Sequence, residues 1–173
     1  QELRHQMNII TDFLRKYVPG YEHCTIKTGA STLGIRESRR FSGKYVMNIS
    51  DLREARRFPD VVVHKAQFVV DIHNPVGGGQ ANGIAEYVDA YDIPWRSLVP
   101  QKMENLIMAG RCISGTHEAM ASYRVMAIAM AIGEAAGIGA ALAIDHDVTP
   151  ENLDVKYIQK ALMDKGAVLF DEK

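Results

Sequence analysis

The feature that most constrains the fold is a long apolar segment, residues 126–144, and the chain leading into it. Residues 105–109 form a short apolar run that ends at Gly110, which predicts a buried strand. Residues 111–125 are polar and rich in small side chains, and they predict a loop. The apolar segment itself, mostly Ala, Ile, Met and Gly, predicts a helix. A strand, a polar loop and a helix in this order are typical of an α/β fold, in which the N-terminal amides of the helix face a ligand crevice.

Within this helix, small residues recur at every fourth position, so they share one face. They are Ala129, Gly133, Gly137 and Ala141. Glycine costs a helix about 1 kcal/mol relative to alanine. We therefore expect a compensating close contact between this face and another backbone or a flat ligand.

The same segment is about long enough to cross a bilayer and has the small-xxx-small spacing of membrane helices. However, Glu134 lies in its middle, and Ala and Gly outnumber the large apolar residues. We therefore predict a buried helix of a soluble protein and no membrane span.

Composition excludes several classes of partner. The net charge of −1 gives no general case for binding nucleic acid. Two cysteines, Cys24 and Cys112, are too few for a disulfide framework, and the six histidines are scattered, so we expect reduced, buried thiols and no metal site. The chain starts at Gln1 instead of Met, and its first residues have the pattern of a helix and not of a signal peptide, which favours a fragment or a processed chain. We expect a cytoplasmic location, although a targeting signal of a longer parent would not be visible in this sequence.

Other segments have simpler patterns. We predict an amphipathic helix over residues 1–18 that packs on the rest, a helix over residues 51–58 capped by Asp51, and a helix over residues 154–165. Strands are predicted over residues 33–49 and 61–72, with a return strand starting at 84–88. Residues 74–83 contain three consecutive glycines, but no Lys-Ser/Thr follows, so we predict a hairpin loop instead of a phosphate-binding loop.

Basic residues and one histidine mark candidate ligand contacts. Arg36, Arg39 and Arg40 lie on the first predicted strand. They could form a solvated basic face of that strand. They could instead form an anion site, because guanidinium groups pair bidentately with carboxylate or phosphate. His73 follows the second strand, in a structural role or in a substrate pocket.

Several blocks together carry a family resemblance. The sequence resembles the C-terminal part of FAD-dependent oxidoreductases sometimes found beside xanthan lyases, within the glutathione-reductase-like flavoproteins. The matching blocks are GIRESRRFSGKYVM (34–47), DIH (71–73), IPWRSLVP (93–100), NLIMAGRCIS (105–114), THEA (116–119), RVMAIAMAIGEAAG (124–137) and KGAVL (165–169).

This resemblance implies a mixed α/β fold in which substrate-domain strands precede the last strand and helix of a Rossmann-like FAD domain. The implied divisions are residues 1–100, 101–146 and 147–173. The sequence has no G-x-G-x-x-G turn, so the resemblance also implies a partner, the N-terminal FAD-binding region of a longer chain.

The resemblance, with the residue chemistry, also implies functional residues. For FAD contact we expect Gly110, Arg111, Ser114, Val125 and Met126. For catalysis on a small-molecule substrate we expect His117, Arg36 and His73. For substrate binding we expect Arg39, Arg40 and Arg96.

Alternatives remain for three of these inferences. His117 suits proton donation near neutral pH, but it and Glu118 could instead brace the loop. The segment between Pro94 and Pro100, predicted to be extended, could cover a flavin through Arg96, or Trp95 could plug a domain junction. The chain as a whole could be a non-catalytic α/β domain for ligand binding or assembly.

Overall fold

A computed structural model describes residues 1–74 and 85–171. The chain divides into two compact units, Gln1–Ile35 and Arg36–Lys173. Most of the predicted loop at 74–83 lies outside the described residues. The predicted divisions after residues 100 and 146 separate functional segments, whereas these two units are defined by compactness. The functional divisions stay a prediction.

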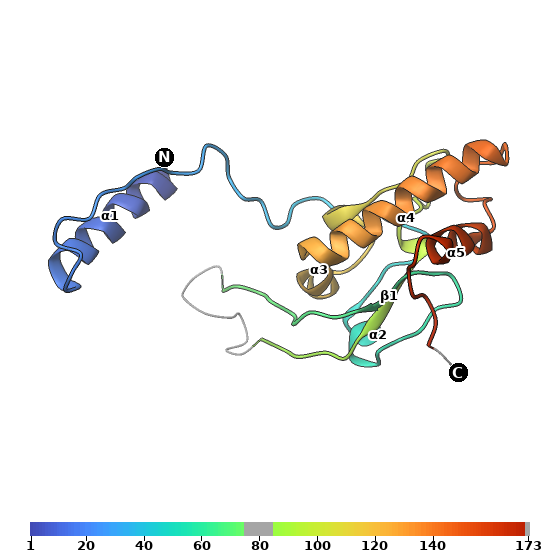
Figure 1. The fold of residues 1–173 in the computed structure, drawn as a ribbon, viewed down its shortest axis with the longest axis horizontal. Helices are drawn as coiled ribbons and strands as arrows, with labels where there is room; N and C mark the ends of the chain where they lie inside the picture. The colour runs from blue at the N-terminus through green and yellow to red at the C-terminus, as the bar shows by residue number, and fades with distance from the viewer. Residues whose placement is uncertain (75–84, 172–173) are drawn as a thin grey trace. The chain divides into compact units, whose positions relative to one another are not determined.

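The first unit is built on helix α1, Glu2–Tyr17, which confirms the predicted helix (Figure 1). Within the unit, Arg15 donates from Nε to the carbonyl of Cys24 at 2.9 Å. No residue of α1 is buried, and Ile10 and Tyr17 on its apolar face are exposed. The packing of this helix on the rest of the chain stays a prediction.

The second unit contains a two-stranded antiparallel sheet, β1 (Val61–Ala66) and β2 (Tyr91–Pro94). Both strands are shorter than the apolar patterns predict. Beyond Ala66, pairing persists as an isolated bridge between Val70 and Glu86. All of β2 is buried, so the sheet lies in the core of the unit.

Two predicted strands do not form. Residues 33–49 make only isolated bridges, Gly43 to Pro100 and Met47 to Gly115. Among the described residues, residues 105–109 make one backbone-to-backbone hydrogen bond to another segment, from the amide of Met108 to the carbonyl of Leu98 at 2.9 Å. An apolar run becomes a strand only where a neighbouring strand completes its hydrogen-bond ladder, and the described residues offer none here.

Helix α2, Ile49–Arg53, begins earlier than predicted. Its N-cap is Asn48, whose side chain accepts from the amides of Ser50 and Asp51, while Asp51 accepts from the amide of Asn48 at 2.9 Å. The prediction that Asp51 is the cap is therefore wrong, because Asp51 is the reciprocal partner of a capping box.

The predicted loop at 111–125 contains two helical pieces, the 3-10 turn η2 (Gly110–Cys112) and helix α3 (His117–Tyr123). Thr116 caps α3 by accepting from the amide of Ala119. A second 3-10 turn, η1 (Trp95–Ser97), replaces the predicted extended segment. His117 thus begins a helix and is not a loop residue.

Helices α4 (Met126–Asp145) and α5 (Val155–Asp164) confirm the other two predicted helices, and they pack against each other. Asp154 caps α5, accepting from the amide of Lys156 at 3.0 Å. Gly166 ends it with a φ of +94°, a conformation that glycine adopts without strain.

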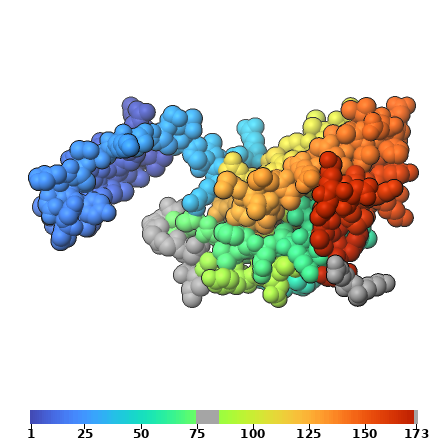
Figure 2. Space-filling model, viewed as in Figure 1, coloured from blue at the N-terminus to red at the C-terminus, as the bar shows by residue number. Residues whose placement is uncertain are grey.

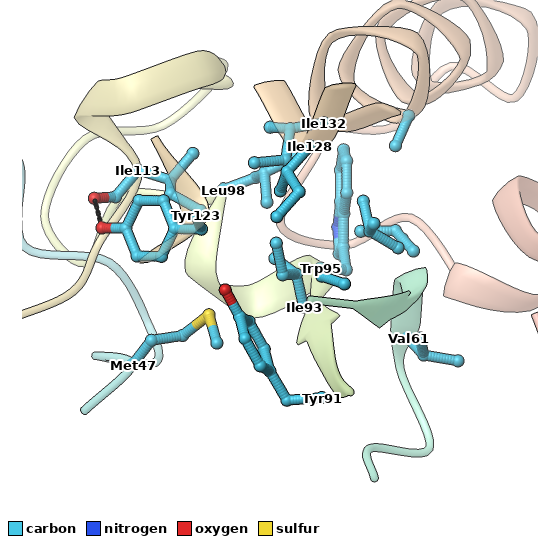
Figure 3. Close-up of a cluster of buried hydrophobic side chains, with 14 of the residues drawn as sticks. Met47, Val61, Tyr91, Ile93, Trp95, Leu98, Ile113, Tyr123, Ile128 and Ile132 are labelled. Carbon is cyan, nitrogen blue, oxygen red and sulfur yellow. Dashed lines mark hydrogen bonds between the residues drawn. The ribbon is translucent and has the colours of Figure 1, made fainter. Parts of the chain in front are cut away.

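The core lies between α4 and the sheet, with Trp95 between Ile132 of α4 and the strands (Figure 3). Gly139 is the glycine of α4 that makes the close contact, because a Cβ there would clash with the indole ring of Trp95. Around Gly133 and Gly137, by contrast, no described atom lies within 4 Å of the Cβ position. The expected backbone contact at these two glycines is not present among the described residues.

The opposite face of α4 is open and apolar. Met126 is 84% exposed and Ile144 is 80% exposed, and Met130 lies between them on the same open face. Figure 2 shows α4, in orange, along the surface of the second unit. The helix is therefore buried on one face only, which corrects the prediction of a buried helix.

Among the described residues, α4 is the one helix long and apolar enough to cross a membrane. Its other face packs on the hydrophobic core of the second unit, with Ile128, Ile132 and Ala135 buried. Cys24 and Cys112 are free but only half-buried, which corrects the expectation of buried thiols.

Candidate functional site

A hollow of about 220 Å³ lies in the second unit, beside the start of α4. Its lining residues are Arg36, Phe68, Asp71, Arg111, Arg124 and Val125. Three guanidinium groups and one carboxylate therefore face a common space. Because guanidinium groups pair well with carboxylates and phosphates, this chemistry suits an anionic group.

Asp71 organises the arginines of the hollow. Arg124 is only 12% exposed and donates from Nη2 to the Asp71 carbonyl at 2.5 Å and to its Oδ2 at 3.2 Å. Arg36 lies further away, with Nη1 at 3.8 Å from the same Oδ2, and its side chain is 60% exposed. Arg124 is thus held by the protein, whereas Arg36 keeps most of its guanidinium open to a ligand.

His73 lies next to this hollow. Its Nε2 is 3.1 Å from Oδ2 of Asp71, the oxygen that Arg36 and Arg124 also approach. The structure therefore brings together Arg36, which the sequence placed on one predicted strand, and His73, which it placed just past the end of another. Their functional roles stay predictions.

A second cluster, formed by Glu37, His117 and Arg40, is connected to the hollow because Glu37 follows Arg36 in the chain. Oε2 of Glu37 lies 2.7 Å from Nδ1 of His117, and its Oε1 forms an ion pair with Arg40. Burial of Glu37 favours the neutral acid, but hydrogen bonds from His117 and Arg40 outweigh it and lower the pKa of this carboxyl. Glu37 therefore stays ionised between His117 and Arg40.

The other predicted arginines lie elsewhere. Arg40 also donates from Nε to the carbonyl of Gly115 at 2.9 Å, so it is tied to the protein, whereas the side chain of Arg39 is exposed. Arg96 pairs with Asp60 through Nε at 2.8 Å and Nη2 at 3.0 Å. None of these three lines the hollow.

Comparison with known proteins supplies the family. The model of the family described as FAD dependent oxidoreductase matches residues 1–162. The chain belongs to the FAD dependent oxidoreductase family. No curated protein and no solved structure matches the chain. The family is FAD dependent, which confirms the cofactor expected from the sequence, and the mixed α/β structure is consistent with part of an FAD-binding oxidoreductase domain.

Residues of η2 and of the start of α4 have chemistry that is compatible with part of this cofactor. Gly110 has a φ of +71°, and no described atom lies within 4 Å of where its Cβ would stand. Arg111 follows and lines the hollow, as does Val125, the N-cap of α4. No side chain caps α4, so its first amides have no hydrogen-bond partner within the helix or from its cap side chain.

Two further predicted FAD contacts differ in accessibility. Met126 is exposed at the first turn of α4, where a ligand could touch it. Ser114 is fully buried, and its Oγ has no hydrogen-bond partner among the described residues. A Cβ at Gly43 would lie against the side chain of Ser114, so no open space adjoins that flank.

Sequence reasoning missed four residues of the site: Phe68, Asp71, Arg124 and Glu37. Asp71 and Arg124 lay within the matching blocks, but neither has a distinctive local pattern. Their pairing joins positions 53 residues apart in the chain. Glu37 lies between Arg36 and Arg39, and the sequence analysis interpreted this segment by its positive charges alone.

Proposed function

We propose that this chain completes the flavin site of an FAD-dependent oxidoreductase and supplies the pocket for a small anionic substrate. The observation that carries the proposal is the position of Val125. This residue is the N-cap of α4 and also lines the hollow with Arg36 and Arg111. A cofactor at the helix start and a substrate in the hollow would therefore be neighbours. Bound FAD supplies the oxidising power, by accepting a hydride equivalent from the substrate.

The start of α4 would hold the flavin electrostatically. Its first amides, which have no partner within the helix, and the positive end of the helix dipole favour negative charge, which the pyrimidine edge of a flavin gains on reduction. Gly110 leaves room for close approach because it has no side chain. Arg111 would add positive charge toward the pyrophosphate or the ribityl side.

The hollow would select the substrate by charge. Arg124 and Asp71 neutralise each other in part and give the hollow a fixed wall. Arg36 is more loosely engaged and carries the guanidinium group that an incoming carboxylate can bind. A volume of about 220 Å³ suits the anionic end of a small molecule.

The open face of α4 would be covered by the FAD-binding region that holds the adenosine diphosphate half of the cofactor. The sequence has no G-x-G-x-x-G turn of its own to bind that half. Open positions at Gly133 and Gly137 allow another backbone to approach closely. Docking would remove the exposed apolar surface of Met126 and Ile144 from water, which is favourable.

The test uses the FAD-loaded oxidoreductase, containing this chain and its FAD-binding region. Small carboxylic acids bearing a hydroxyl or amino group, each beside its methyl ester, are mixed with it without oxygen, and flavin absorbance is followed. We expect the acids to reduce the flavin at lower concentrations than their esters.

Two arginine variants sharpen the test. Arg36→Ala should raise the half-saturating acid concentration about 10-fold or more, as expected for a lost charged hydrogen bond. Arg39→Ala, outside the hollow, should change it less than about 2-fold. Equal behaviour of acids and esters, or of the two variants, contradicts the anion pocket. Retained flavin that no compound reduces favours a non-catalytic ligand-binding domain.

A further inference from the structure

The contact between Glu37 and His117 is the closest pairing of a carboxylate and an imidazole at the site, with Oε2 and Nδ1 2.7 Å apart. His117 is the first residue of α3, and its side chain is 50% exposed. Glu37 is less exposed, at 24%. A partly buried acid thus holds one ring nitrogen of an accessible histidine.

Glu37 is itself held in place. Arg40 pairs with its second oxygen and donates to the carbonyl of Gly115 at 2.9 Å. Gly115 packs against the ring of Tyr123, whose hydroxyl donates to the carbonyl of Ile113 at 3.2 Å (Figure 3). The carboxylate is therefore anchored through Arg40 to the buried core and cannot rotate freely away from the imidazole.

This contact determines which nitrogen of His117 is available. An ionised carboxylate only accepts hydrogen bonds, so Nδ1 must carry a proton toward Glu37. In the neutral ring the lone pair is then on Nε2. Within the described part of the chain, Nε2 of His117 has no hydrogen-bond partner.

The second histidine of the site is engaged differently. His73 contacts Asp71 through Nε2 at 3.1 Å, and Asp71 also binds Arg124. That carboxylate is shared among several cations, and the contact occupies Nε2. Glu118, the acidic neighbour of His117, instead accepts hydrogen bonds from its own amide and from Thr116. Glu37 is therefore the carboxylate that orients His117.

We infer that Glu37 is the positioning residue of His117, presenting Nε2 as the proton acceptor of the reaction; this rests on the function proposed above. When the substrate is oxidised, its C–H bond breaks and the hydride goes to the flavin. The hydroxyl or amino group attached to the same carbon loses a proton from its O–H or N–H bond, and that proton goes to Nε2. The two electrons left on oxygen or nitrogen form the C=O or C=N bond, so atoms and electrons balance.

A spectroscopic test examines the positioning without flavin or substrate. Nitrogen-15 spectra of the 173-residue chain report the tautomer of neutral His117. We expect the Nδ1–H form in the unmodified chain, its loss in Glu37→Ala, and its partial return in Glu37→Asp. Glu118→Ala is the matched control and should leave the tautomer unchanged. An unchanged tautomer in Glu37→Ala overturns the inference, whatever becomes of the anion pocket.

A kinetic test examines the consequence in the FAD-loaded oxidoreductase, with the acid that reduces the flavin fastest. Glu37→Ala should lower the limiting rate of flavin reduction roughly 10- to 100-fold, the usual effect of losing a residue that orients a ligand or base. The half-saturating concentration should stay within about 2-fold, and Glu37→Asp should restore part of the rate. A raised half-saturating concentration with an unchanged rate would assign Glu37 to substrate binding and overturn the positioning role.

Discussion

Gly139 of α4 packs directly on the indole ring of Trp95. A Cβ at position 139 would lie 2.9 Å from Cζ3 of the indole and 3.2 Å from Cδ1 of Ile158. The indole is fixed in turn, because its Nε1 donates to the carbonyl of Pro150 at 3.3 Å. This contact determines which face of α4 is buried and therefore which face is left open.

A methyl group at position 139 should therefore destabilise the chain. We expect Gly139→Ala to lower the free energy of unfolding by about 1–3 kcal/mol, the usual cost of overpacking a core. Gly137→Ala is the matched control, because its Cβ position is open, and it should raise the free energy by about 0.5–1 kcal/mol through helix propensity. Urea denaturation of both variants measures the difference, and equal stabilities would show that the Trp95 contact is not close.

The open face of α4 makes a second prediction, about assembly. Gly137→Leu should not destabilise this chain and should raise its free energy of unfolding slightly through helix propensity, because no described atom outside the local helix backbone lies within 4 Å of that Cβ position. In the FAD-loaded oxidoreductase the same leucine should block close docking of the FAD-binding region and so weaken FAD retention. Urea denaturation of the chain and flavin release from the oxidoreductase measure the two effects. Full FAD retention by Gly137→Leu would exclude that face as the docking surface.

A third prediction concerns Tyr91, which is buried on β2. Burial raises its pKa to about 12, although the hydrogen bond with Ser122, at 2.8 Å between oxygens, opposes the shift. The folded-state pKa lies above the ordinary value of 10.0, so this contribution to stability is complete below pH 10 and is lost as pH rises toward 12.

We therefore expect the free energy of unfolding to fall between pH 10 and pH 12, and to fall less in Tyr91→Phe. Near neutral pH, Tyr91→Phe should lower the free energy of unfolding by about 1 kcal/mol, because one hydrogen bond is lost. Ser122 keeps its bond to the carbonyl of Phe68 at 2.6 Å, which limits that cost. Urea denaturation across this pH range measures both values, and parallel curves for the two proteins would contradict the assignment.

Much of the site was visible in the sequence as residue types but not as an arrangement. Arg36, His73, Arg111 and Val125 were all expected near a ligand, and the structure gathers them in or beside one hollow. What the sequence could not show was which of three arginines faces that hollow. Their neighbours decide this, because Glu37 and Gly115 engage Arg40, and such contacts join distant parts of the chain.

Local sequence signals were sufficient to predict three of the helices. Apolar patterns predicted α1, α4 and α5, because each helix satisfies its own backbone hydrogen bonds and its signals lie close together in the chain. Only the tertiary structure decided the strands and the buried face of α4. A strand needs a partner that periodicity does not reveal, so residues 105–109 stayed irregular. The buried face of α4 depended on where Trp95 lies, and that placed Gly139, instead of Gly133 or Gly137, in the core.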